Sequence, residues 1–203
     1  GALYLVAGVL SGLLKAGRTG GGTVVDAAIV DGSAHMMALL MSMAPSAHLR
    51  RERGQTLLDG PHWSRVYSCF CGGYLSVQCR ERQFYAVFLR LLGLEETQAF
   101  AQQNVRSEWR TQGAALEAIF AQHPLAHWAA IFDGSDGCVA PVLAPTNAAQ
   151  EAHMAARAVW QQGCNGLEPA PAPRFDGAAR AVSAPPARGA QSEEIRAWLA
   201  SEA

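Results

Sequence analysis

Residues 23–30 read TVVDAAIV, a β-branched and nearly uninterrupted apolar run. Such a run is typical of a strand in a parallel sheet that is covered on both faces, because the side chains on both faces must then be apolar. Two apolar stretches that predict helices, residues 3–16 and 35–43, lie on either side of it. Glycines close the first helix, and Asp31-Gly32-Ser33 supplies the turn before the second. Helix, strand and helix with short connections predict an α/β layer.

Further along the chain the pattern changes to that of a small antiparallel domain. Residues 65–71 and 74–79 are aromatic and β-branched, and the Gly-Gly pair between them predicts a β-hairpin. Helices are expected over residues 81–92, 107–121, 125–132, 151–160 and 192–199, and a short strand over residues 138–143. Pro141 favours a sheet edge for that strand, because proline cannot donate a ladder hydrogen bond.

Composition excludes several classes of protein. Sixteen Lys and Arg balance seventeen Asp and Glu to a net charge of -1, so no nucleic-acid or anionic-membrane partner is expected. The apolar run of residues 3–14 is too short to span a bilayer. Five cysteines without metal-ligand spacing predict neither a disulfide framework nor a metal site, and they favour a reducing compartment. Cys69 and Cys71 are expected on one strand face as small buried hydrophobes.

Five blocks of the sequence stand out along the chain: GTVVDAAIVDG (22–32), LDG (58–60) with RVY (65–67), LSVQCRERQFY (75–85), WAAIFDGSDGCVAPVL (128–143) and PAPRF (171–175). In the same order, these blocks resemble those of the family III CoA transferases (the CaiB/BaiF superfamily), and within them the α-methylacyl-CoA racemases. The Leu-Asp-Gly block and the carboxylate before Gln-Phe-Tyr favour the racemase branch.

The resemblance implies an α/β fold in three parts. Residues 1–57 would be the remainder of a large Rossmann-like domain, with a polar, arginine-rich connection at its end. Residues 58–148 would form a small α+β domain with a β-hairpin and helices. Residues 149–203 would return to the large domain as a segment and an extended Ala/Pro-rich arm. The resemblance also implies an intertwined homodimer, located in the cytoplasm of a bacterium or in mitochondria or peroxisomes of a eukaryote.

The chemistry that the resemblance implies is racemisation of 2-methylacyl-CoA thioesters. A base removes the α-proton, the thioester holds the carbanion as an enolate, and an acid returns a proton to the opposite face. Acyl-CoA is the substrate and no cofactor or metal is expected. The family's His/Asp pair would lie before residue 1, which makes this chain catalytically incomplete. Two alternatives remain: a family III CoA transferase that moves CoA between carboxylic acids, and an inactive fragment that serves as a structural or interaction module.

Glu81 matches the family's supporting carboxylate, which sits beside the catalytic histidine. A carboxylate there would orient the imidazole and favour its charged form. The alternative is a solvated glutamate at a helix start. Arg80 and Arg82 stand where the family has an apolar residue and proline, and either could engage the Glu81 carboxylate in a salt bridge.

Seven residues are expected to form the acyl-side wall of the site. Flexible thioethers can line a pocket for acyl chains of varied shape, although core filling is the alternative for the methionines. His62 could touch substrate or pack at a domain boundary. His123 and His127 are four apart, but Pro124 between them argues against a metal site. The expected substrate-binding residues are Met37, Met41, Met43, Leu58, Asp59, Gly60 and Tyr67.

Overall fold

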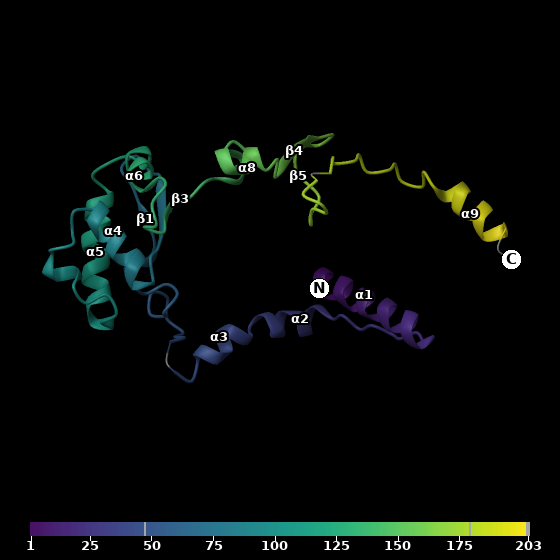
Figure 1. Ribbon diagram of the computed structural model, residues 1–203, viewed down its shortest axis with the longest axis horizontal. Helices are drawn as coiled ribbons and strands as arrows, with labels where there is room; N and C mark the ends of the chain where they lie inside the picture. The colour runs from purple at the N-terminus through teal and green to yellow at the C-terminus, as the bar shows by residue number, and fades with distance from the viewer. Residues whose placement is uncertain (47, 179, 202–203) are drawn as a thin grey trace. The chain divides into compact units, whose positions relative to one another are not determined.

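The computed structural model describes residues 1–46, 48–178 and 180–201 (Figure 1). The chain divides into two compact units, Gly1–Val142 and Leu143–Ala203, and each is considered by itself. Helices and small antiparallel sheets alternate in it, which confirms the mixed α/β class. The domain boundaries predicted after residues 57 and 148 stay predictions. No helix in the described part of the chain is long and apolar enough to cross a membrane.

The first unit opens with helix α1 (Ala2–Thr19), as predicted. It ends where Gly20 takes a left-handed conformation (φ 71°) and its N–H bonds to the carbonyl oxygen of Ala16. The apolar side chains of α1 are largely exposed, and none of its residues is buried.

The predicted strand over residues 23–30 is wrong. Residues 21–28 form neither helix nor strand, no strand in the described ranges pairs with them, and helix α2 (Ile29–Met36) begins inside the predicted strand. The segment packs on α1 instead, where a side chain added at Gly8 would meet Val25 and one added at Gly12 would meet Thr23. The predicted cover on both faces is also absent from the described part of the chain, where Val24 is 95% exposed and Ile29 and Val30 are each 72% exposed. An apolar run does not specify a hydrogen-bonding neighbour, so the pattern could not establish a strand.

The single helix predicted over residues 35–43 is split in two. His35 lies at the end of α2, where its Nδ1 is 2.6 Å from the Tyr4 hydroxyl of α1. Helix α3 (Ala38–Met43) follows after Met37.

The predicted hairpin is confirmed as β1 (Ser64–Ser68) and β2 (Tyr74–Gln78), paired antiparallel from Ser64–Gln78 to Ser68–Tyr74. Strand β3 (Val139–Pro141) pairs antiparallel with the other side of β2, so Pro141 lies on an edge strand as expected. The hairpin turn includes Cys71 at φ 67°. Cys71 is exposed while Cys69 is buried, so the shared buried face predicted for them is wrong: the turn begins before Cys71.

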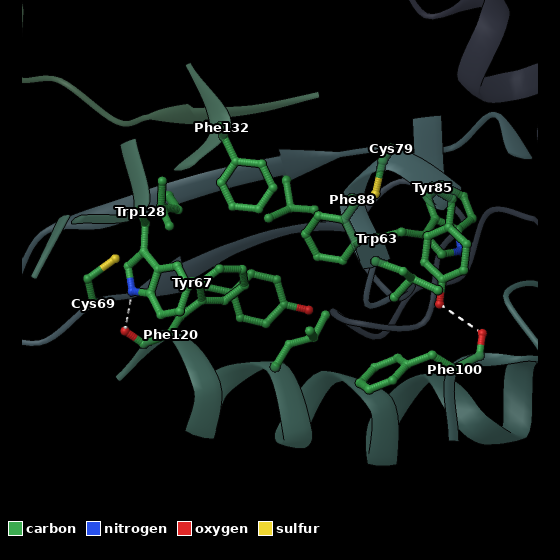
Figure 2. Close-up of a cluster of buried hydrophobic side chains, with 14 residues drawn as sticks. Trp63, Tyr67, Cys69, Cys79, Tyr85, Phe88, Phe100, Phe120, Trp128 and Phe132 are labelled. Atoms are coloured by element: carbon green, nitrogen blue, oxygen red, sulfur yellow. Dashed lines mark hydrogen bonds between the residues drawn. The ribbon is translucent and has the colours of Figure 1, made fainter. Parts of the chain in front are cut away.

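Three helices enclose the core of this unit with the three-stranded sheet, and all three lie within a residue or two of prediction. They are α4 (Arg82–Leu91), α5 (Trp109–Phe120) and α6 (Leu125–Phe132), with short 3-10 turns η1 (Gln98–Phe100) and η2 (Arg106–Glu108) before α5. Figure 2 shows the aromatic rings of the core gathered between the sheet and α5. Phe88 lies near-parallel to Phe132 (18° between planes), and Trp128 meets Phe120 edge-on.

The second unit is small and holds no fully buried side chain among its described residues. It contains α7 (Pro145–Ala148), α8 (Ala152–Ala156), the hairpin β4 (Trp160–Gly163) and β5 (Gly166–Pro169), and α9 (Ser192–Ser201). The helix predicted over residues 151–160 is therefore too long. Ala158 takes φ 47°, which ends the helix, and Trp160 begins a strand. The terminal helix predicted at 192–199 is confirmed.

Candidate functional site

Glu81 stands at the N-terminal boundary of α4, and Cys79 and Arg80 connect it to the end of β2. Its backbone is extended (φ -70°, ψ 138°), its carbonyl oxygen accepts from the Tyr85 N–H at 2.9 Å, and its side chain is exposed without capping the helix. In the described part of the chain, neither Arg80 nor Arg82 forms an ion pair with it. The salt bridge considered from the sequence is therefore not formed, and the carboxylate faces solvent.

The Glu81 carboxylate acts electrostatically on two thiols. Burial raises the pKa of Cys79 to about 12, and the charges of Cys138 and Glu81 add to that rise. The pKa of the Cys138 thiol is raised by desolvation first and by Glu81 and Asp136 next. Both cysteines therefore remain protonated and are poor nucleophiles near neutral pH.

The Leu58-Asp59-Gly60 block forms a tight loop before β1. Asp59 accepts hydrogen bonds from the Gly54 N–H (2.8 Å) and the Thr56 N–H (3.0 Å). Partial desolvation works to raise the Asp59 pKa, but the bonds from Thr56 and Gly54 and the charge of Arg53 together lower it. The carboxylate therefore organises its own loop, and its predicted role toward substrate stays a prediction, as does that of the exposed Leu58.

Tyr67 and the methionines fall in opposite environments. Tyr67 is 1% exposed, and its hydroxyl donates to the His62 carbonyl oxygen in the core. The Tyr67 ring therefore packs in the core of the first unit and is not in contact with solvent. Met37 and Met41 are exposed, at 44% and 60%, and Met43 is half-buried, so they do not fill a core within this chain. Substrate contact by these residues stays a prediction.

His62, left open between substrate contact and packing, is fully buried. Its Nε2 is 2.8 Å from the Tyr85 hydroxyl, which also lies 3.1 Å from the Phe100 carbonyl oxygen. If the hydroxyl donates to Phe100, then His62 carries its proton on Nε2, and its Nδ1 is a buried acceptor without a partner. Desolvation, followed by the charge of Arg65, lowers the His62 pKa to about 4. The neutral ring packs in the core and does not meet the solvent.

The buried neutral histidine predicts a pH-dependent stability. Unfolded His62 gains a proton near its ordinary pKa of 6.5, whereas the folded ring stays neutral down to about 4, so stability falls as pH drops through that window. We expect the free energy of unfolding, measured with urea, to fall by up to about 2 kcal/mol between about pH 7 and pH 5. His62→Phe should flatten the profile there; an unchanged slope would contradict the assignment. Asp59 contributes to the pH dependence of stability in a separate, more acidic range. Its pKa is lowered in the folded chain, so its stabilising contribution is lost as the pH falls below its ordinary pKa of 3.8.

A cluster that the sequence did not predict adjoins Glu81. Trp63 and Trp109 meet edge-on, with ring centroids 6.4 Å apart, and both indole N–H groups donate to the carbonyl oxygen of Gln103, at 3.0 and 3.2 Å. The Gln103 side-chain amide donates in turn to the carbonyl oxygens of Cys79 (3.2 Å) and Arg80 (2.8 Å). Arg80 belongs to a quoted block, but no motif marks Gln103, whose partners are brought to it only by the fold.

The described residues hold no group of three or more His, Cys, Asp or Glu side chains placed to bind a metal. His123 and His127 stack on each other with centroids 4.0 Å apart, and both rings meet Trp128 edge-on. This packing agrees with the interpretation of the pair as structural.

Comparison with known proteins supplies the family. The profile of CoA-transferase family III matches residues 1–192. The chain is 34% identical over 176 residues to the α-methylacyl-CoA racemase of Mus musculus, covering 85% of this chain and 46% of the racemase. It is 33% identical over 145 residues to that of Homo sapiens, covering 70% of this chain and 37% of the racemase. The chain thus spans about half the length of the curated relatives it matches.

Solved structures agree on the fold. A CAIB/BAIF family protein from Brucella suis superposes with a TM-score of 0.69 at 22% identity, over 97% of this chain and 53% of that one. The Rv3272 protein of Mycobacterium tuberculosis superposes with a TM-score of 0.66 at 19% identity, over 90% of this chain and 49% of that one. A profile match over nearly the whole chain and racemase relatives above 30% identity lead to one conclusion: the chain belongs to CoA-transferase family III.

Proposed function

We propose that a protein carrying this segment together with the rest of the family domain racemises 2-methylacyl-CoA thioesters. The observation that carries the proposal is the 34% identity to the mouse racemase, which extends over 85% of this chain. The block around Glu81 lies inside the span of the family match, and its carboxylate is exposed at the start of α4. The proposal needs no metal or redox cofactor, because the thioester itself acidifies the α-proton.

In the proposed reaction, a base takes the proton from C2 and the bonding electron pair moves into the thioester carbonyl, which gives an enolate. Reprotonation of C2 from the opposite face inverts the centre, so no atom is gained or lost except the exchanged hydrogen. Glu81 is proposed as a positioning residue: its carboxylate would orient the histidine that handles the proton and stabilise its charged form. The solvent-facing geometry of Glu81 leaves it accessible to such a partner.

The apolar surface of the first unit supports two further parts of this proposal. Side chains of α1 to α3, such as Leu3 (84%) and Met36 (76%), are exposed far more than is usual for an apolar helix. Met37 and Met41 would offer the acyl chain a deformable wall. A homodimer in which subunits cover such surfaces is also proposed; sedimentation of the whole protein measures it, and a stable monomer would count against it.

Isotope exchange tests the reaction directly. A 2-methylacyl-CoA incubated with the whole protein in D2O, with no acceptor acid, should take up deuterium at C2 and lose optical purity, followed by mass spectrometry and chiral analysis. Glu81→Gln should slow exchange by about 10- to 100-fold, because the imidazole loses its charged partner. Glu95→Gln, an exposed glutamate just beyond α4, is the matched control and should leave the rate unchanged.

The other outcomes of that experiment are equally informative. Transfer of CoA to an added carboxylic acid, without exchange at C2, would reject racemisation and support a family III CoA transferase. Absence of both activities in a folded whole protein would reject both enzymatic functions and support the third alternative, an inactive structural or interaction module. Equal rates for Glu81→Gln and Glu95→Gln would retain the reaction but remove Glu81 from it.

A further inference from the structure

Three hollows on the first unit share lining residues and are rich in arginine; together we call them the arginine groove. The central hollow, of about 400 Å³, has Trp63 and Trp109 among its lining residues. It shares Arg80 with a second hollow and Arg106 with a third, of about 340 and 360 Å³. The arginines that line the groove are Arg53, Arg65, Arg80, Arg82, Arg106 and Arg110.

The groove concentrates positive charge in a chain that is nearly neutral. Six of the sixteen lysines and arginines line it, while the net charge of the chain is -1. No aspartate or glutamate is among the described residues that line these three hollows. A concave surface of one sign focuses its field and raises the local concentration of ions of the opposite sign.

Nearby carboxylates neutralise only part of this charge. Glu117 lies 3.6 Å from Arg65, and the charge of Arg53 acts on Asp59, whose oxygens already bind the backbone of their own loop. Arg80 and Arg110 are exposed, and neither forms an ion pair with a described residue. Their guanidinium groups are available for a ligand.

The groove is also held in place before any ligand arrives. Gln103, itself buried, fixes both indoles through its carbonyl oxygen and the Arg80 backbone through its side-chain amide. Arg106 lies over the Trp109 ring at 5.7 Å and donates to the carbonyl oxygen of Gln55. These contacts hold the two indoles, the Arg80 backbone and the Arg106 side chain in place, which reduces part of the ordering cost of binding.

We propose that the arginine groove binds a small organic anion through paired phosphate or carboxylate groups. Guanidinium groups recognise both through charge-assisted and often bidentate hydrogen bonds. The central hollow has the size of a small-molecule site, and the two tryptophans give it an apolar floor. The proposal concerns binding by this chain alone and does not depend on the racemase reaction.

Titration calorimetry on the 203-residue chain at low salt tests the groove. The probes are pyrophosphate and inorganic phosphate in one arm, glutarate and acetate in the other, and uncharged glycerol as the reference. We expect saturable binding of pyrophosphate or glutarate, tighter than that of the corresponding single-group anion. The arm that binds identifies whether phosphate or carboxylate is the natural group.

Matched variants decide whether the groove is responsible. The double variant Arg80→Gln/Arg110→Gln should weaken binding at least about tenfold, since each guanidinium supplies charge-assisted hydrogen bonds. Arg90→Gln, an exposed arginine on α4 outside the groove, should bind like the parent. Circular dichroism confirms that both variants are folded. Absence of saturable binding at millimolar probe, or equal loss in both variants, would overturn the proposal.

Discussion

Replacing Phe120 by alanine should lower the free energy of unfolding by about 3–5 kcal/mol, the range found for large aromatic side chains deleted from cores. Phe120 is fully buried at the end of α5 and touches rings from three other elements, with centroid distances of 5.1 Å to Tyr67, 6.4 Å to Phe88 and 5.2 Å to Trp128. Alanine would leave those rings facing a cavity that the surrounding sheet and helices cannot close.

The loss in Phe120→Ala arises from packing alone. Trp128 donates its indole N–H to the Phe120 carbonyl oxygen at 3.0 Å, and that bond survives the substitution because it uses the backbone (Figure 2). Urea unfolding followed by circular dichroism measures the effect. Phe70→Ala is the control: its ring is 57% exposed, so it should cost under about 1 kcal/mol. Similar losses in both variants would contradict the placement of Phe120 at the centre of the core.

The parts of the fold that the sequence predicts well are those whose signals are local. Gly72-Gly73 between two alternating runs predicts the hairpin of β1 and β2, and the spacing of Phe84, Phe88 and Leu91 predicts α4. The hairpin of β4 and β5 was not predicted, because its two turn residues, Cys164 and Asn165, do not form one of the dipeptides that mark a hairpin. The strand predicted over residues 23–30 was wrong for another reason. Strand formation requires a neighbouring strand to pair with, and an apolar run does not specify one.

The same distinction between local signals and contacts made only by the fold applies to the candidate site. Glu81, Asp59 and Gly60 could be named as candidates because they lie in recognisable blocks, and their roles toward substrate stay predictions. The structure places Glu81 at the helix start that the pattern indicated. Gln103 could not be found, because its partner Trp63 is forty positions away and glutamine carries no pattern of its own. His62 was left open because only burial distinguishes a packed imidazole from one that touches substrate.

Substituting Gly60 by alanine should destabilise the first unit by about 1–3 kcal/mol through crowding. A Cβ at position 60 would lie 2.7 Å from the Thr56 carbonyl oxygen and 2.8 Å from that of Gly54, and both are backbone atoms that cannot rotate away. The Gly60 N–H also binds the Thr56 carbonyl oxygen at 2.9 Å, so relief of the clash would break the loop that Asp59 holds. Thermal and urea unfolding measure the cost.

Two controls separate crowding from the other effects of losing a glycine. Gly54→Ala in the same loop meets no atom within 4 Å but places alanine at φ 75°, so it should cost only the left-handed penalty of about 1–2 kcal/mol. Gly17→Ala in α1 has neither problem and should not lower stability, since alanine favours a helix. A Gly60→Ala variant as stable as Gly17→Ala would show that the loop has room. If a glycine is needed at position 60 for this backbone contact, activity loss in Gly60→Ala should follow the loss of folded protein. A fully folded but inactive variant would instead place Gly60 against the substrate.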